Sequence, residues 1–145
     1  MRQCKLIIDG VDIEAVHKIY LIESPHDLSV PIRPYETETY PEEDGVTIYP
    51  FTSDEAFEYK VSLCYFGDEN TANAVINDLY ESFFIKTEHL RKAKEVTIDN
   101  LYKGVVIVGY PRAMNGTGME VTAGKETWFF DLTFYVAEPH KCSFK

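Results

Sequence analysis

The sequence has few basic residues and no long apolar run. Its 145 residues hold 14 Lys and Arg against 24 Asp and Glu, which gives a formal net charge of −10. Such an excess of negative charge repels a phosphate backbone, whose binding needs clustered Lys and Arg. No stretch approaches the roughly 18–20 apolar residues that a membrane helix needs. The sequence therefore predicts neither sequence-specific nucleic-acid binding nor membrane insertion.

Cysteine is also scarce. The three cysteines, Cys4, Cys64 and Cys142, form an odd and widely spaced set, which is not the pattern of a disulfide framework. Cys64 lies in a strand-like run and is expected to be a small buried apolar residue. Near the N-terminus, Asp9 comes before the apolar core of a signal peptide could form. These features predict a protein that is made and kept in a cytosol.

The basic residues form one small cluster. Two acidic residues interrupt this cluster. Its basic members are Lys86, Arg91, Lys92 and Lys94, and the interrupting residues are Glu88 and Glu95. Mixed charge of this kind is typical of a solvated surface. We therefore expect a solvated turn after a helix here.

Aromatic residues, in contrast, make up 14% of the chain, and most lie in runs that alternate with polar residues. In residues 55–66, the side chains from Phe57 to Tyr65 alternate between an apolar and a polar face, which is typical of a half-buried strand. Residues 125–138 alternate in the same way, but aromatics occur on both faces there. Both faces of that strand are therefore expected to be covered, by a helix or by another subunit. The predicted strands cover residues 3–9, 16–23, 55–66, 95–99, 102–110 and 125–138.

One helix is predicted from about residue 70 to 85. Its apolar residues recur at helical spacing and form a single stripe, which consists of Ala72, Val75, Ile76, Leu79 and Phe83. Asp68 or Asn70 is expected to cap its first turn. A helix of this amphipathic kind is suited to lie over a sheet.

Two loops stand out. Residues 24–45 contain four prolines and six acidic residues, so a regular central strand or helix is not expected there. Connections this long in a small domain are often functional. The glycine-rich residues 114–118 are predicted to form the tip of a long hairpin between the last two strands.

These elements predict a mainly β (α+β) fold in one domain, residues 1–145. One helix among six or so strands excludes a parallel βαβ sheet. We expect an antiparallel β-sandwich or split barrel with one flanking helix.

No motif predicts catalysis, a metal or a cofactor. The four histidines lack the spacing of a metal site, and Glu42-Glu43-Asp44-Gly45 lacks that of a calcium loop. Ser24, His26 and Asp27 have the side chains of a catalytic triad, but real triads are assembled across a fold. The sequence therefore predicts a protein that is not an enzyme.

An ordered set of short features nevertheless resembles a known family. These features are the loop with Arg33 that ends in Glu43-Asp44-Gly45, the strand 57–66, the helix with Leu79 and Phe83, the Tyr102-Lys103-Gly104 turn, and the closing Ala137-Glu138-Pro139. In this order they resemble tail proteins of long-tailed phages and prophages, especially the N-terminal ring domain of distal tail proteins and the related tail-tube fold. The larger galectin-like domain of many distal tail proteins is missing, so a ring-domain-only member is implied.

The resemblance implies a structural protein of a phage-like tail. Such domains assemble into a ring, commonly a hexamer, around the passage for DNA, and they contact other tail proteins. The implied location is the bacterial cytoplasm during assembly and then the tail of the particle. An acidic lumen would repel passing DNA. The candidate interface residues are Pro31, Arg33, Tyr35, Tyr40, Phe129 and Tyr135.

Other interpretations of the sequence remain open. The aromatic residues are divided between core and interface in a ring, whereas in a monomer they form a single core. A small β-barrel that binds an apolar ligand is an alternative function. A hydrolase whose triad is assembled only in the fold is another.

Overall fold

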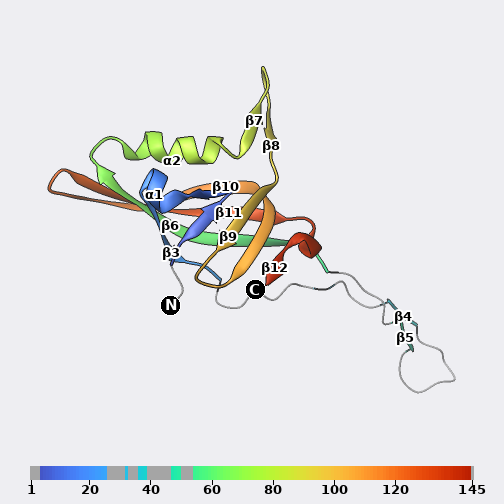
Figure 1. Ribbon diagram of the computed structural model, residues 1–145. Coiled ribbons are helices and arrows are strands. Elements are labelled where there is room, and N and C mark those ends of the chain that lie inside the picture. Colours follow the sequence, from blue (N-terminus) through green and yellow to red (C-terminus); the bar gives the residue numbers. More distant parts are fainter. Residues whose placement is uncertain (1–3, 26–31, 33–35, 39–46, 50–53, 145) are drawn as a thin grey trace.

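The computed structural model describes residues 4–25, 32, 36–38, 47–49 and 54–144, and it is mainly β (Figure 1). The strands are β1 (Leu6–Ile8), β2 (Val11–Asp12), β3 (Ile19–Glu23), β4 (Glu36–Glu38), β5 (Thr47–Tyr49), β6 (Phe57–Asp68), β7 (Phe84–Lys86), β8 (Arg91–Ala93), β9 (Val96–Asn100), β10 (Val105–Thr122), β11 (Lys125–Val136) and β12 (Ser143–Phe144). The helices are α1 (Ile13–His17), α2 (Ala72–Glu81) and the 3-10 helix η1 (Pro139–Lys141).

The main sheet is antiparallel and follows the order β2-β1-β9-β10-β11-β6-β3, with β12 also pairing with β10. The long strand β10 joins its two halves, because its first residues pair with β9 and the later ones with β11. At this change of partner the register shifts between Pro111 and Ala113. An extra residue of this kind bends a strand and increases its twist. The predicted mainly β, antiparallel fold with a flanking helix is confirmed.

The core lies on the face of the sheet that α2 covers (Figure 1). As predicted, alternate residues of β6 and β11 are buried, from Tyr59 to Tyr65 and from Phe130 to Val136. The apolar stripe of the helix packs against them. Just after α2, the ring of Phe83 meets that of Phe134 edge-on, with 5.6 Å between the centroids.

One buried polar contact connects β6 to the end of β9. The side-chain amide of Asn100 donates to the Tyr59 hydroxyl at 3.1 Å, and its oxygen accepts from the backbone N–H of Lys103. Burial raises the pKa of Tyr59, although the bond from Asn100 opposes this. Because both side chains are buried, each needs its partner to offset the loss of water.

The sequence interpretation missed a second helix. Residues 16–17 were expected in a strand, but they belong to α1, and β3 begins only at Ile19. The reason is local capping: the Asp12 carboxylate accepts hydrogen bonds from the N–H groups of Glu14 and Ala15. Lys18 ends the helix with φ 57°.

The predicted helix 70–85 is shorter than expected. Thr71, rather than Asp68 or Asn70, caps α2, without a side-chain hydrogen bond to the helix. The chain leaves the helix after Glu81 and forms a hairpin from β7 and β8. The basic cluster after the helix is solvated as expected, and residues 87–90 form its turn, but this turn is the end of a hairpin whose strands were not predicted.

The predicted hairpin tip at residues 114–118 is also wrong. These residues lie inside β10, where Met114 faces Leu132 and Gly118 faces Phe129. The glycines instead accommodate a second register shift, between Gly116 and Gly118. The turn is at Ala123 and Gly124, with φ of 52° and 77°, as the primed two-residue turns of hairpins require.

The position of Ala123 leads to a first prediction. A left-handed conformation is unfavourable for alanine but is well tolerated by asparagine. We expect Ala123→Asn to raise the free energy of unfolding by about 0.5–1 kcal/mol, measured by urea denaturation. Thr122→Asn, at a neighbouring position outside the left-handed region, is the control. Equal effects of both substitutions would show that the turn conformation is not the cause.

Most of the predicted loop 24–45 lies outside the described residues. β4, within this loop, pairs with β5, just after it, in a short antiparallel ribbon, and neither strand pairs with another described strand. An isolated bridge joins Ile32 to Asp54.

Candidate oligomer interface

The candidate interface is the second face of the sheet formed by β3, β6 and β11, which is turned away from the core. Alternation along these strands places Tyr20, Cys64 and Phe129 in one row, since Cys64 pairs with both of the others. Phe129 is half-buried, Tyr20 is exposed, and the nearby Phe66 is 48% exposed. We call these four residues the aromatic row. Exposed aromatic side chains grouped in this way are typical of protein interfaces.

A polar group lies next to the aromatic row. The hydroxyl of Ser62 donates to Asp131 at 2.8 Å, and the Lys60 ammonium lies 3.4 Å from the same carboxylate. Asp131 is largely buried whereas Lys60 is exposed. The Ser62 bond fixes the carboxylate, while an ion pair to so exposed a lysine contributes little stability.

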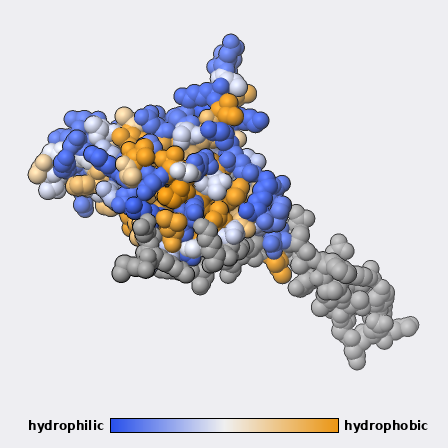
Figure 2. Space-filling model, in the orientation of Figure 1, coloured by the Kyte–Doolittle hydropathy of each residue, from blue (hydrophilic) through white to orange (hydrophobic). Residues whose placement is uncertain are grey.

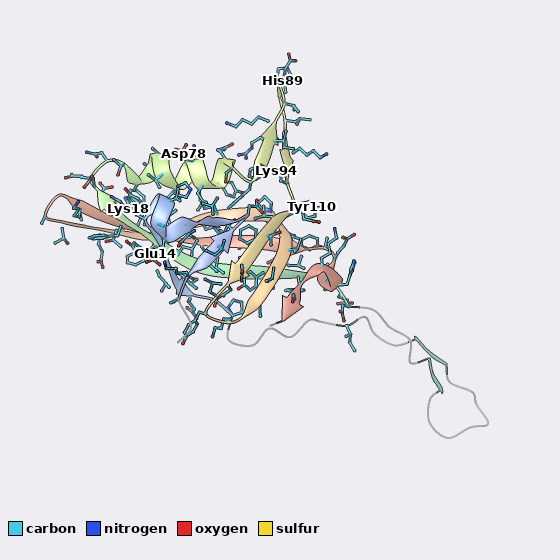
Figure 3. All side chains as sticks on the ribbon, viewed as in Figure 1. Glu14, Lys18, Asp78, His89, Lys94 and Tyr110 are labelled. Atoms are coloured by element: carbon cyan, nitrogen blue, oxygen red, sulfur yellow. The ribbon has the colours of Figure 1, made fainter. Side chains whose placement is uncertain are left out.

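Tyr135 lies at the other end of this face. It pairs across the strands with Tyr110 and Glu58. The guanidinium of Arg112, at the bulge of β10, lies 5.5 Å from the Tyr135 ring centroid and binds Glu58 at 3.0 Å. Figure 3 labels Tyr110 at this bend. The bulge thus directs a cation over an exposed aromatic ring, which holds Tyr135 at the surface.

The open edge of the sheet adds to this surface. β3 is the last strand of the sheet order, and among the described strands only β6 pairs with it. Ile22 on this strand is 50% exposed. The free N–H and C=O groups of an edge strand can pair with another chain.

The structure places two of the predicted interface residues on one face, toward opposite ends of β11. These residues are Phe129 and Tyr135. Pro31, Arg33, Tyr35 and Tyr40 lie outside the described residues. The sequence interpretation missed Tyr20 and Phe66, because alternation assigns a face within one strand but does not tell which strands are neighbours.

Cys64 is less buried than expected. It is half-buried on the aromatic row, and burial raises the pKa of its thiol, although a hydrogen bond from the Tyr20 backbone opposes this. Cys4 is exposed and Cys142 is half-buried, and all three cysteines are free.

The residues considered for catalysis do not form a described site. Ser24 is buried beside a cavity of about 220 Å³ that Glu23, Pro25, Lys60 and Ser62 also line, but His26 and Asp27 lie outside the described residues. In the described part of the chain, no three His, Cys, Asp or Glu residues are grouped as metal ligands would be. None of the helices described there is long and apolar enough to cross a membrane.

Comparisons with known proteins support the resemblance at the level of the fold. No family model matches the sequence, and no curated protein has significant sequence similarity to it. Among solved structures, however, the fold is similar to that of a protein from the adsorption apparatus of phages that infect Gram-positive bacteria.

That structure is SPP1 Dit (gp 19.1), described as a paradigm of the hub adsorption apparatus. The TM-score is 0.61 at 20% sequence identity, and the alignment covers 93% of this chain. It covers 50% of Dit, so the chain spans half the length of that protein. The resemblance to distal tail proteins is thereby confirmed for the fold.

Proposed function

We propose that this chain is a non-enzymatic structural component of a phage-like tail that assembles into a ring around the passage for DNA. The observation that carries the proposal is the similarity to SPP1 Dit over 93% of the chain. We propose six copies in the ring, contacts with other tail proteins, and one domain of residues 1–145. Assembly takes place in the bacterial cytoplasm, and the final location is the tail.

The surface of the chain supports self-assembly. The aromatic row and Tyr135 expose apolar area on one face, and β3 leaves an edge open beside it. When two different surfaces of neighbouring subunits meet head to tail, cyclic symmetry closes the contacts into a ring. Phe129 and Tyr135 belong to this interface in our proposal, together with Pro31, Arg33, Tyr35 and Tyr40.

The charge supports the proposed passage. A net charge of −10 keeps DNA from binding to a surface that it passes. The same charge makes the separate subunits soluble before assembly.

Cys64 gives a direct test of the interface, since it lies in the aromatic row between Tyr20 and Phe129. In the monomer we expect it to react slowly with a maleimide, because it is half-buried and burial raises its thiol pKa. In the assembled protein we expect its reaction to slow by at least about tenfold further, because the neighbouring subunit covers the face. Mass spectrometry of peptides measures the rate at each cysteine.

Cys142 is the internal control in the same sample, because it is half-buried like Cys64 but lies outside the aromatic row, between η1 and β12. If Cys64 keeps its monomer rate in assembled protein of verified mass, the aromatic row is not an interface. If both cysteines slow equally, the effect is not specific to the row.

A further inference from the structure

The β7–β8 hairpin is a separate projection of the molecule. Its two strands pair with each other and with no other described strand. Figure 1 shows it standing beyond the C-terminal end of α2, away from β3. In Figure 2, apolar residues lie at its base and polar residues at its tip.

One face of this hairpin is held by the end of α2. Arg91 donates to Glu81 at 2.7 Å, and the Lys86 ammonium lies 3.4 Å from the other oxygen of that carboxylate. The Arg91 guanidinium also lies 4.6 Å from the ring centroid of Phe84. These contacts orient the hairpin on the helix.

The opposite face is apolar and basic. Ile85 pairs with Lys92 across the hairpin, on the side turned away from Glu81. Ile85 is 50% exposed, and Leu90 at the turn is 76% exposed. Lys92 and Lys94 are exposed beside them, and Figure 3 shows Lys94 near the base of the hairpin. We call Ile85, Leu90, Lys92 and Lys94 the free face.

The distribution of charge indicates what this face binds. Residues 84–94 contain four basic residues and one acidic residue, a net charge of +3, so the remainder of the chain has −13. Exposed apolar side chains flanked by lysines fit an acidic protein surface. A second copy of this chain offers such a surface, whereas its remaining charge repels DNA.

We propose that the free face of the β7–β8 hairpin docks on a second copy of this chain. The inference rests on the proposed self-assembly and adds to it a second contact, distinct from the aromatic row. Because the Glu81 contacts already orient the hairpin within its own subunit, its free face can bind a neighbouring subunit without refolding.

The test compares charge reversals in the hairpin with a control elsewhere. Lys92→Glu with Lys94→Glu is expected to raise the dissociation constant of self-association at least about tenfold, measured by sedimentation. The control, Lys125→Glu with Lys141→Glu, changes the net charge by the same amount outside the hairpin. It is expected to change the dissociation constant little. Leu90→Ala, which leaves the charge unchanged, is expected to weaken assembly as well. Thermal unfolding monitors the fold of each variant.

A photo-crosslinker at Leu90, in an equal mixture of isotopically heavy and light copies, identifies what the hairpin touches. We expect crosslinks between heavy and light chains, which form only when the hairpin of one copy contacts another copy. If the wild type assembles, and the variant with Lys92→Glu and Lys94→Glu assembles as well as the control variant, the hairpin contact is wrong while the proposed ring still stands. If the wild type stays monomeric at high concentration, the proposed self-assembly fails too. Binding of duplex DNA that the hairpin reversals abolish would assign the face to nucleic acid and overturn the inference.

Discussion

Phe134→Ala is expected to lower the free energy of unfolding by about 3–5 kcal/mol, the usual cost of deleting a buried phenylalanine. Phe134 is fully buried, and its ring packs edge-on against that of Phe83, which joins β11 to the segment after α2. Alanine leaves a cavity at the centre of the core, which the packed sheet cannot fill by small movements. Urea denaturation of the monomer measures the change.

The neighbouring residue gives the matched control, because Tyr135 is exposed on the opposite face of the same strand. We expect Tyr135→Ala to change stability by less than about 1 kcal/mol. Comparable losses for both variants would contradict the assignment of the two faces of β11.

Phe129→Asp is expected to weaken self-association by about a hundredfold or more, as truncation of a central aromatic residue does in known interfaces. The substitution removes the half-buried ring from the aromatic row and places a charge beside Asp131. Its effect on the stability of the monomer is expected to be smaller, because the ring is already partly in water. Sedimentation measures the association and urea denaturation the stability.

Val16→Asp is the control for this prediction. Val16 is exposed on α1, outside the aromatic row, so the same kind of apolar-to-acidic change is made at another surface. The dissociation constant for self-association of the Val16→Asp variant is expected to stay close to that of the wild type. If Phe129→Asp assembles normally, the aromatic row has no role in the ring, whereas an equal loss in both variants indicates a general effect of charge.

The sequence was sufficient for the parts of the fold that periodicity controls. Alternation along β6 and β11 correctly separated the buried residues from the outer ones, and helical spacing located the buried stripe of α2. These patterns are reliable because a large apolar face has only one way to be buried.

Local conformations were harder to predict. The hydrogen bonds of Asp12 determine α1, although the residues around Val16 alternate like a strand. The turn at Ala123 and Gly124 lacks the usual Asn-Gly sequence. The hairpin tip was therefore predicted at residues 114–118, where two glycines lie close together. In both cases a few specific contacts outweigh the general propensity.

The candidate site was predictable only in part. The family resemblance gave the fold, and it directed attention to Phe129 and Tyr135. The contacts of Phe129 with β6 and of Cys64 with Tyr20 depend on strand order and register, which one sequence does not contain. The free face of the β7–β8 hairpin was missed for the same reason, since its charges are mixed in sequence and are sorted only by the pairing of the strands.

The mass of the protein in solution tests the central claim most directly. Light scattering at high protein concentration is predicted to give a closed assembly of several copies, about 100 kDa for six chains of 16.7 kDa. The mass is expected to fall toward that of one chain on dilution or with Phe129→Asp. A mass of 16.7 kDa at the highest attainable concentration would contradict the proposed ring.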